Sequence, residues 1–143
     1  MNKKGFTLVE LLAVIVILAI ILAIAVPSIT GILNSAKRSS FEADVKLIIK
    51  GIEYKMLERD AGTIVDETIL PENAPTEGAP FYMTENGLTA YGANADNYVV
   101  NTTGEACIIT SLNPVTVTVI SKSTSEFGAY TATGTRNTLT VTP

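Results

Sequence analysis

Residues 5–10 read Gly5-Phe6-Thr7-Leu8-Val9-Glu10, and the sixteen residues that follow, 11–26, are drawn only from Leu, Ala, Val and Ile. An α-helix rises about 1.5 Å per residue, so the apolar run alone spans roughly 24 Å. Residues 6–10 extend such a helix to about 30 Å, the thickness of the hydrocarbon core of a bilayer. The sequence therefore predicts one membrane-spanning helix, and the rest of the chain is arranged around it.

Glu10 is the only charged residue between Phe6 and Val26. A carboxylate in a membrane span costs about 2.5–3.5 kcal/mol on insertion scales unless a partner neutralises it. A segment that served only as an anchor would omit this residue. The sequence therefore indicates that Glu10 has a partner and a function beyond anchoring.

A short basic leader, Met1-Asn2-Lys3-Lys4-Gly5, stands before Phe6, and Pro27 interrupts the apolar helix. In this combination the first thirty residues resemble a type IV prepilin. The resemblance implies that a prepilin peptidase cuts between Gly5 and Phe6 and that Phe6 is then N-methylated. It also implies that the mature subunits pack by their helices into a homopolymer, built by pilus assembly machinery. In this assembly the Phe6 amine pairs with Glu10.

Two alternatives compete for the same stretch. A secretory signal peptide also combines basic, apolar and small-residue regions, and Ala23-Ile24-Ala25 supplies a cleavage motif. Its apolar core, however, usually measures about 7–15 residues and has no acid at its front. A plain single-span anchor explains the length of the run but neither Gly5-Phe6 nor Glu10. Both alternatives account for fewer of the residues than the prepilin resemblance does.

The mature chain is acidic. The net charge is −4, and without the leader, which holds Lys3 and Lys4, 8 basic and 14 acidic side chains leave −6. Six basic residues between positions 37 and 59 form either a DNA-contacting face, as in competence pseudopilins, or a solvated helix face interleaved with acids. Net acidity favours the solvated face, so nucleic acid is not the favoured partner. These residues are Lys37, Arg38, Lys46, Lys50, Lys55 and Arg59.

Cys107 is the only cysteine, so the chain has no intrachain disulfide, and its apolar neighbours predict a buried thiol. Many pilins of diderm bacteria close a C-terminal loop with two cysteines. Because that pair is missing, the chain more closely resembles the cysteine-poor pilins of Gram-positive bacteria.

Pro27 has no amide hydrogen, so it should kink or loosen the helix, and Gly31 adds a second weak point. Beyond them an apolar stripe at helical spacing predicts an amphipathic half, which should end near Gly62 in a left-handed cap. Gly51, inside that half, predicts close packing or a local bend. The stripe consists of Phe41, Val45, Ile48, Ile52 and Met56, with ion pairs expected beside it between Glu42 and Lys46 and between Lys50 and Glu53.

Residues 63–97 carry scattered Pro, Gly and acidic residues and predict a variable loop region. The rest predicts an antiparallel meander with strands at 98–101, 105–111, 115–121, 127–133 and 139–142. One face of this sheet needs a cover, and the apolar stripe is the only long surface available. The predicted fold is therefore α+β, with a long helix packed on a small antiparallel sheet. The predicted divisions are a leader (1–5), a transmembrane and polymerisation helix (6–29), its amphipathic half (30–60) and a head (61–143).

The sequence offers little for catalysis, metal binding or cofactor binding. It contains no histidine, which excludes Ser-His-Asp and Cys-His catalysis and the His-Glu-x-x-His zinc site. Asn94-Ala95-Asp96-Asn97 offers oxygen ligands but lacks the bidentate Glu of a calcium loop, so a turn is favoured. Asn101-Thr102-Thr103 matches a glycosylation motif that often occurs by chance. We expect no enzyme activity, no metal and no cofactor.

The predicted function is that of a structural subunit of a type IV pilus or pilus-like filament. The subunit is held in the membrane by its helix, in contact with lipid, and then drawn into a filament on the cell surface. One alternative is a minor pseudopilin of a type II secretion or DNA-uptake system. A second, from another class, is a membrane-anchored surface binding module that never polymerises.

The sequence makes one prediction about processing. Because Gly5-Phe6 follows two lysines as in a prepilin site, the mature chain should begin at an N-methylated Phe6. Mass spectrometry of the N-terminal peptide from sheared surface material measures this directly. An N-terminus at Val26, after the Ala23-Ile24-Ala25 motif, would identify a secretory signal peptide instead.

Overall fold

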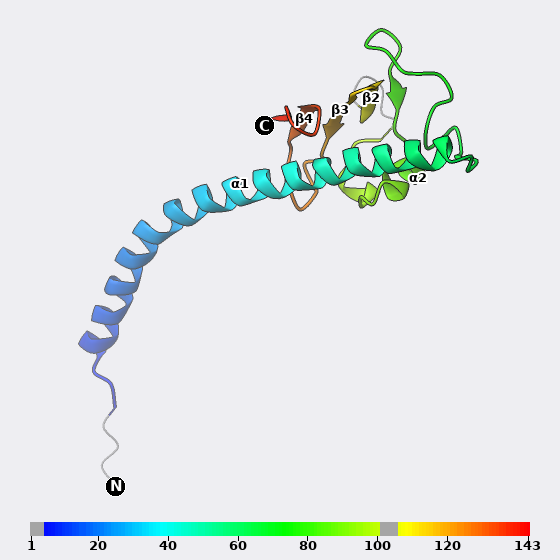
Figure 1. Cartoon of the computed structure of the whole chain (residues 1–143). Helices are drawn as coiled ribbons and strands as arrows, with labels where there is room; N and C mark the ends of the chain where they lie inside the picture. The colour runs from blue at the N-terminus through cyan, green and yellow to red at the C-terminus, as the bar shows by residue number, and fades with distance from the viewer. Residues whose placement is uncertain (1–4, 101–105) are drawn as a thin grey trace. The chain divides into compact units, whose positions relative to one another are not determined.

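The computed structural model describes residues 5–100 and 106–143. The chain divides into two compact units, Met1–Ala36 and Lys37–Pro143, which are described separately. One helix, α1 (Leu8–Asp60), supplies most of the first unit and the first element of the second (Figure 1). The glycosylation motif at 101–103, the start of the strand expected at 105–111 and residues 1–4 of the leader lie outside the described residues.

In the first unit α1 is helical through Pro27 and Gly31. Pro27 leaves the Ala23 carbonyl without its i+4 amide donor, and the Thr30 hydroxyl donates to the Pro27 carbonyl (2.9 Å). α1 is long and apolar enough to cross a membrane. Its large apolar side chains from Leu8 to Val26 are between 51% and 83% exposed. The described residues of this unit do not cover them.

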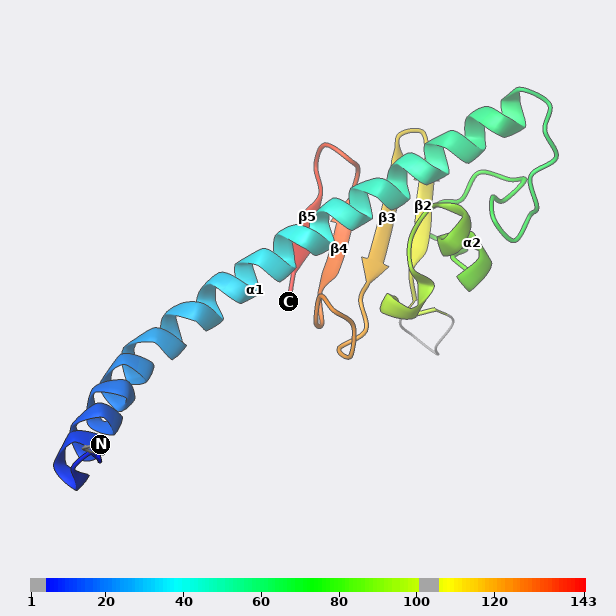
Figure 2. The same ribbon diagram turned by 90° about the horizontal axis from the view of Figure 1, so that it is seen from below.

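The second unit is built on a five-stranded antiparallel sheet with strand order β1-β2-β3-β4-β5 (Figure 2). This confirms the predicted antiparallel meander and the α+β class. The strands are β1 (Phe81–Tyr82), β2 (Ile108–Leu112), β3 (Val115–Ile120), β4 (Thr131–Gly134) and β5 (Thr140–Thr142).

Three of the predicted strand boundaries were wrong. The strand expected at 98–101 is not formed, because Tyr98 makes only an isolated bridge with Ser121. The sheet instead gains β1, from the segment that was expected to be a loop. Ala106 and Cys107 precede β2. The strand expected from Phe127 begins only at Thr131. Here the Ser121 hydroxyl accepts from the Tyr130 amide (2.9 Å) and donates to the Gly128 carbonyl (2.6 Å), which holds this segment as a loop.

One face of the sheet packs on α1, as predicted. β3 alternates strictly, with Val117 and Val119 fully buried, and the apolar stripe of α1 lies in the same core. Ile49 is also fully buried, which the sequence analysis missed, while Met56 is only partly buried. The buried residues of α1 are Phe41, Val45, Ile48, Ile49 and Ile52.

Aromatic rings and one polar pair join α1 to the loops around the sheet. The Phe41 ring lies 5.7 Å from Phe127 and 6.4 Å from Tyr98, centroid to centroid. The Tyr98 hydroxyl donates to the Asp44 carboxylate of α1. Burial, followed by this hydrogen bond, raises the pKa of Tyr98, so the phenol stays a donor.

The segment after α1 contains short, capped elements. At the end of α1 the Gly62 amide bonds to the Arg59 carbonyl and the Thr63 amide to the Glu58 carbonyl, with Gly62 at φ +88°. This is a Schellman cap, as expected at Gly62. A short helix α2 (Glu85–Ala90) follows, and then a single 3-10 turn, η1 (Ala95–Asn97).

At Gly51 the backbone of α1 lies very close to the backbone of Tyr91. A Cβ at this position would lie 2.3 Å from the Tyr91 carbonyl oxygen and 2.5 Å from the Tyr91 Cα. Tyr91 is itself fixed, because it is 3% exposed and its hydroxyl donates to the Ile69 carbonyl. Close packing, rather than a bend, therefore explains the glycine.

The Gly51→Ala variant tests this packing. Although Ala is the better helix former, the added methyl must push apart two backbones, so we expect a loss of about 1–3 kcal/mol in the free energy of unfolding. Chemical denaturation followed by tyrosine fluorescence reports on the second unit, Lys37–Pro143, which holds all five tyrosines. Gly78→Ala is the matched control, because its Cβ meets nothing within 4 Å. Equal stability of the two variants would contradict this explanation.

Candidate functional site

The residues singled out for processing lie just before α1. Gly5 and Phe6 are in coil, and the Phe6 side chain is 91% exposed. The peptide bond between them therefore lies outside the regular helix. Phe6, Leu11 and Val14 border Glu10 in a shallow apolar hollow of about 540 Å³.

Thr7 and Glu10 cap the N-terminus of α1 reciprocally. The Thr7 amide and the Thr7 hydroxyl both donate to Glu10 Oε2, at 2.8 Å and 2.7 Å. In return the Glu10 amide donates to the Thr7 hydroxyl at 3.3 Å. This is a capping box, in which two helix-end amides that lack an intrahelical acceptor are satisfied by side chains.

The predicted partner of Glu10 was the Phe6 amine, and Thr7 was not predicted to bind it. The signal was available, since Thr-x-x-Glu directly before an apolar run is the sequence pattern of a capping box. Within one chain Thr7 holds the Glu10 carboxylate. Both Thr7 donors use Oε2, and Oε1 makes no hydrogen bond to the described residues. One carboxylate oxygen is therefore left for another donor.

The basic residues of α1 in the head make structural contacts. Arg38 donates to the Val141 carbonyl (3.0 Å), and Arg59 donates to the Pro71 carbonyl (3.1 Å). Lys46 pairs with Glu42 as expected, and Lys55 pairs with Glu58. The expected pair between Lys50 and Glu53 is not formed, because Glu53 binds Arg136 instead (2.9 Å). Four of the six basic residues are thus already engaged, which favours a structural role over a DNA-binding face.

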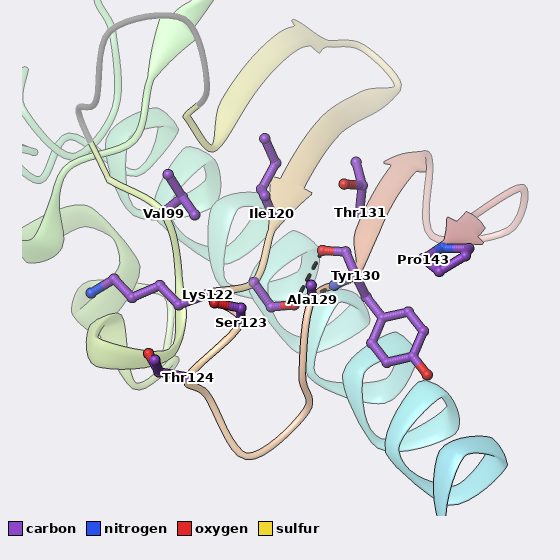
Figure 3. A pocket seen from close by; sticks show the side chains of 10 residues that line it. Val99, Ile120, Lys122, Ser123, Thr124, Ala129, Tyr130, Thr131 and Pro143 are labelled. Carbon is purple, nitrogen blue, oxygen red and sulfur yellow. Dashed lines mark hydrogen bonds between the residues drawn. The ribbon is translucent and has the colours of Figure 1, made fainter. Parts of the chain in front are cut away.

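A shallow hollow of about 510 Å³ lies at one end of the sheet (Figure 3). Val99, Ile120 and Thr131 line it together with Lys122, Ser123 and Thr124. Hydroxyls, a single cation and aliphatic side chains provide no catalytic set. Within residues 5–100 and 106–143 there is also no group of three His, Cys, Asp or Glu side chains that could hold a metal.

Two other polar positions have a local structural role. The Asn94 side chain accepts from the Asp96 amide (3.2 Å) and caps η1, so this segment forms the favoured turn. The Cys107 side chain is fully buried as predicted, and its sulfur accepts from the Ile120 amide (3.3 Å). Burial raises the pKa of the thiol to about 11, which keeps it protonated and unreactive.

The N-terminal segment is similar to a known family. Residues 1–26 match the family model described as the prokaryotic N-terminal methylation motif. The chain is 29% identical over 107 residues to the type IV narrow pilus major component PilA5 of Thermus thermophilus, covering 73% of this chain and 92% of that protein. It is 32% identical over 63 residues to the ComG operon protein 3 homolog of Bacillus licheniformis, covering 44% and 65%. No solved structure matches the chain.

PilA5 is by its name a structural component of a pilus. The methylation motif, the similarity to a pilus component along nearly that protein's whole length, and the long apolar helix joined to an antiparallel sheet all agree. Together they make this chain similar to type IV pilins, the subunits of pilin-type filaments.

Proposed function

We propose that the chain waits in the membrane, held by α1, and is then drawn into a surface filament made of copies of itself. The peptidase cut falls between Gly5 and Phe6, and Phe6 is N-methylated. The supporting observation is the apolar surface of Leu8–Val26, which the described residues of its own unit leave exposed. Lipid covers this surface before assembly, and neighbouring subunits cover it afterwards.

The same residues support a functional division of the chain. Residues 1–5 are the leader, 6–29 the transmembrane and polymerisation helix, 30–60 its amphipathic half, and 61–143 the loop region and sheet of the head. The end of α1 at Asp60 and the buried stripe on its second half support this division. A filament subunit is favoured over a minor pseudopilin or a non-polymerising module, because the pilus component is matched along 92% of its length.

Pro27 and Gly31 form the proposed weak point of α1. The Ala23 carbonyl has lost its amide donor, so unwinding residues 23–26 sacrifices fewer hydrogen bonds there than elsewhere in the helix. Ala19, a strong helix former, limits how far unwinding extends toward the N-terminus.

We predict that α1 unwinds around residues 23–26 when subunits pack, and that Pro27→Ala, which restores the donor, keeps this stretch helical. A cryo-electron-microscopy map of the filament shows either state directly. A straight, continuous helix from Ile20 to Gly31 in the wild-type filament would refute the prediction.

Glu10 is the proposed guide for assembly. In the single chain its Oε2 is occupied by Thr7 and its Oε1 makes no hydrogen bond to the described residues. Cleavage creates an α-amine on Phe6, with an unperturbed pKa of about 7.7–8.0 and hence mostly cationic near neutrality. Docking a second subunit brings its amine beside this carboxylate and neutralises a charge that is otherwise costly in hydrocarbon.

Glu10→Gln separates the charge of this residue from its capping role. Glutamine can still accept from the Thr7 amide, because capping boxes use Glu or Gln at this position. We expect normal synthesis and membrane insertion but slowed or absent filament growth. The measurement compares membrane-fraction subunit with sheared filament for each strain.

Glu42→Gln is the matched control, since it removes a charge of the same kind from an exposed pair in the head. It should leave filament yield unchanged. Normal filament yield in Glu10→Gln at a normal subunit level would show that the charge does not direct assembly.

A further inference from the structure

The sheet of the head has a second face, which is turned away from α1 (Figure 2). Side chains alternate along a strand, so those between the buried ones point to this outer sheet face. Strand pairing aligns them in two rows that run across the sheet. The first row consists of Tyr82, Ile108, Thr118, Thr133 and Thr140. The second row consists of Ile120, Thr131 and Thr142.

The outer sheet face carries no charge. None of the strands β1 to β5 that the structure describes contains Asp, Glu, Lys or Arg. About 25–35% of the residues on a protein surface are usually charged, so roughly two or three charges would be usual among these positions. Strand propensity accounts for the threonines but not for this absence. A charged ligand would find no counter-charge within the two rows, so the outer sheet face suits a neutral partner.

The two rows present hydroxyl, methyl and aromatic groups in a regular array. The Thr118 and Thr133 hydroxyls lie 3.3 Å apart across the strands, and the Tyr82 side chain at the end of the first row is 57% exposed. Neighbouring strands lie about 4.8 Å apart, which is close to the length of one sugar unit in an extended glycan chain. Sugar hydroxyls can bond to the threonines, while the C–H face of a sugar ring packs on a tyrosine ring.

The second row leads into the hollow of about 510 Å³ at one end of the sheet (Figure 3). Ile120 and Thr131 belong to both, and Ser123 and Thr124 add two more hydroxyls to the wall of the hollow. The loop that follows is held in place by the Ser121 hydroxyl, which binds its backbone. A loop that is already ordered costs less entropy when a ligand binds.

We propose that the outer sheet face binds a neutral polysaccharide with an extended, β-linked chain. This inference rests on the proposed filament function. If copies of the chain pack by α1, the opposite face of each head is turned away from the filament axis and stays accessible. A filament then presents the same site many times, so that sites of low individual affinity together hold a polymer firmly.

Sedimentation with insoluble cellulose and insoluble chitin tests the proposal. The full-length chain, in micelles of a detergent without a sugar headgroup, should sediment with at least one of these two neutral polymers. The soluble hexasaccharide of the bound polymer should release it. Polygalacturonate, an extended glycan that carries a negative charge on each unit, should not compete.

Substitutions locate the binding site. Tyr82→Ala should raise the dissociation constant about fivefold or more, because the aromatic contact is lost, whereas Tyr82→Phe keeps the ring and should bind within about twofold of wild type. Thr133→Val keeps the shape of the side chain but loses a hydroxyl, and should weaken binding about threefold. Tyr54→Ala is the matched control, since Tyr54 is 61% exposed but lies on α1. Circular dichroism checks that each variant is folded.

Several results would overturn the inference: no sedimentation of the wild-type subunit with either polymer, competition by polygalacturonate, or equal losses in Tyr82→Ala and Tyr54→Ala. The same assay on sheared filaments tests whether the face is accessible after assembly. Filaments that fail to bind, although subunits in micelles do, would also overturn it and leave the proposed function intact. If wild-type cells make no filament, the proposed function fails, whatever the subunits in micelles bind.

Discussion

The structure depends on the burial of one face of α1 against the sheet. Five fully buried side chains of the helix meet the inward side chains of β2 to β5, and the core contains no other long apolar surface. Burying a large aliphatic side chain stabilises a fold by about 1.5–3 kcal/mol, so this contact dominates the stability of the head. Phe41 and the Tyr98–Asp44 hydrogen bond fix where along the helix the loops attach.

The same helix explains why a single chain is incomplete. From Leu8 to Val26 the large apolar side chains are between 51% and 83% exposed, and the described residues of their own unit do not cover them. Exposed apolar surface of this extent is disfavoured by water and typically marks a site of contact with a membrane or with another protein. Glu10 is the only charged residue of this stretch, and the Thr7 amide and hydroxyl at the start of α1 both donate to its carboxylate. The combination of a well-packed head and a helix with exposed apolar side chains suits a filament subunit.

The polar residues of the head mainly close its edges. β1 has only two residues, and at the opposite edge Arg38 caps the Val141 carbonyl of β5. Short or capped edges discourage strand pairing between heads, which would compete with packing by helices. Four of the six basic residues considered as a DNA-contacting face thus make structural contacts within the chain. Arg136, which binds Glu53, similarly ties the turn between β4 and β5 to α1.

The sequence alone determined the features that follow from local periodicity. The membrane helix, the buried stripe, the alternation of β3 and the cap at Gly62 each depend on residues close together in the chain, whose spacing directly sets which face they share. Thr7 with Glu10 belongs to this class too, because Thr-x-x-Glu before an apolar run is the local pattern of a capping box. Only the tertiary structure decided the features that depend on distant partners. β1 is a strand because it pairs with the edge of β2. Residues 127–130 form a loop because the Ser121 hydroxyl makes hydrogen bonds with the Gly128 carbonyl and the Tyr130 amide. Gly51 is needed because the Tyr91 backbone, forty residues away, approaches to a distance that no side chain allows. Such contacts leave no periodic signal in the sequence, since they are set by which surfaces meet after the helix and sheet have formed.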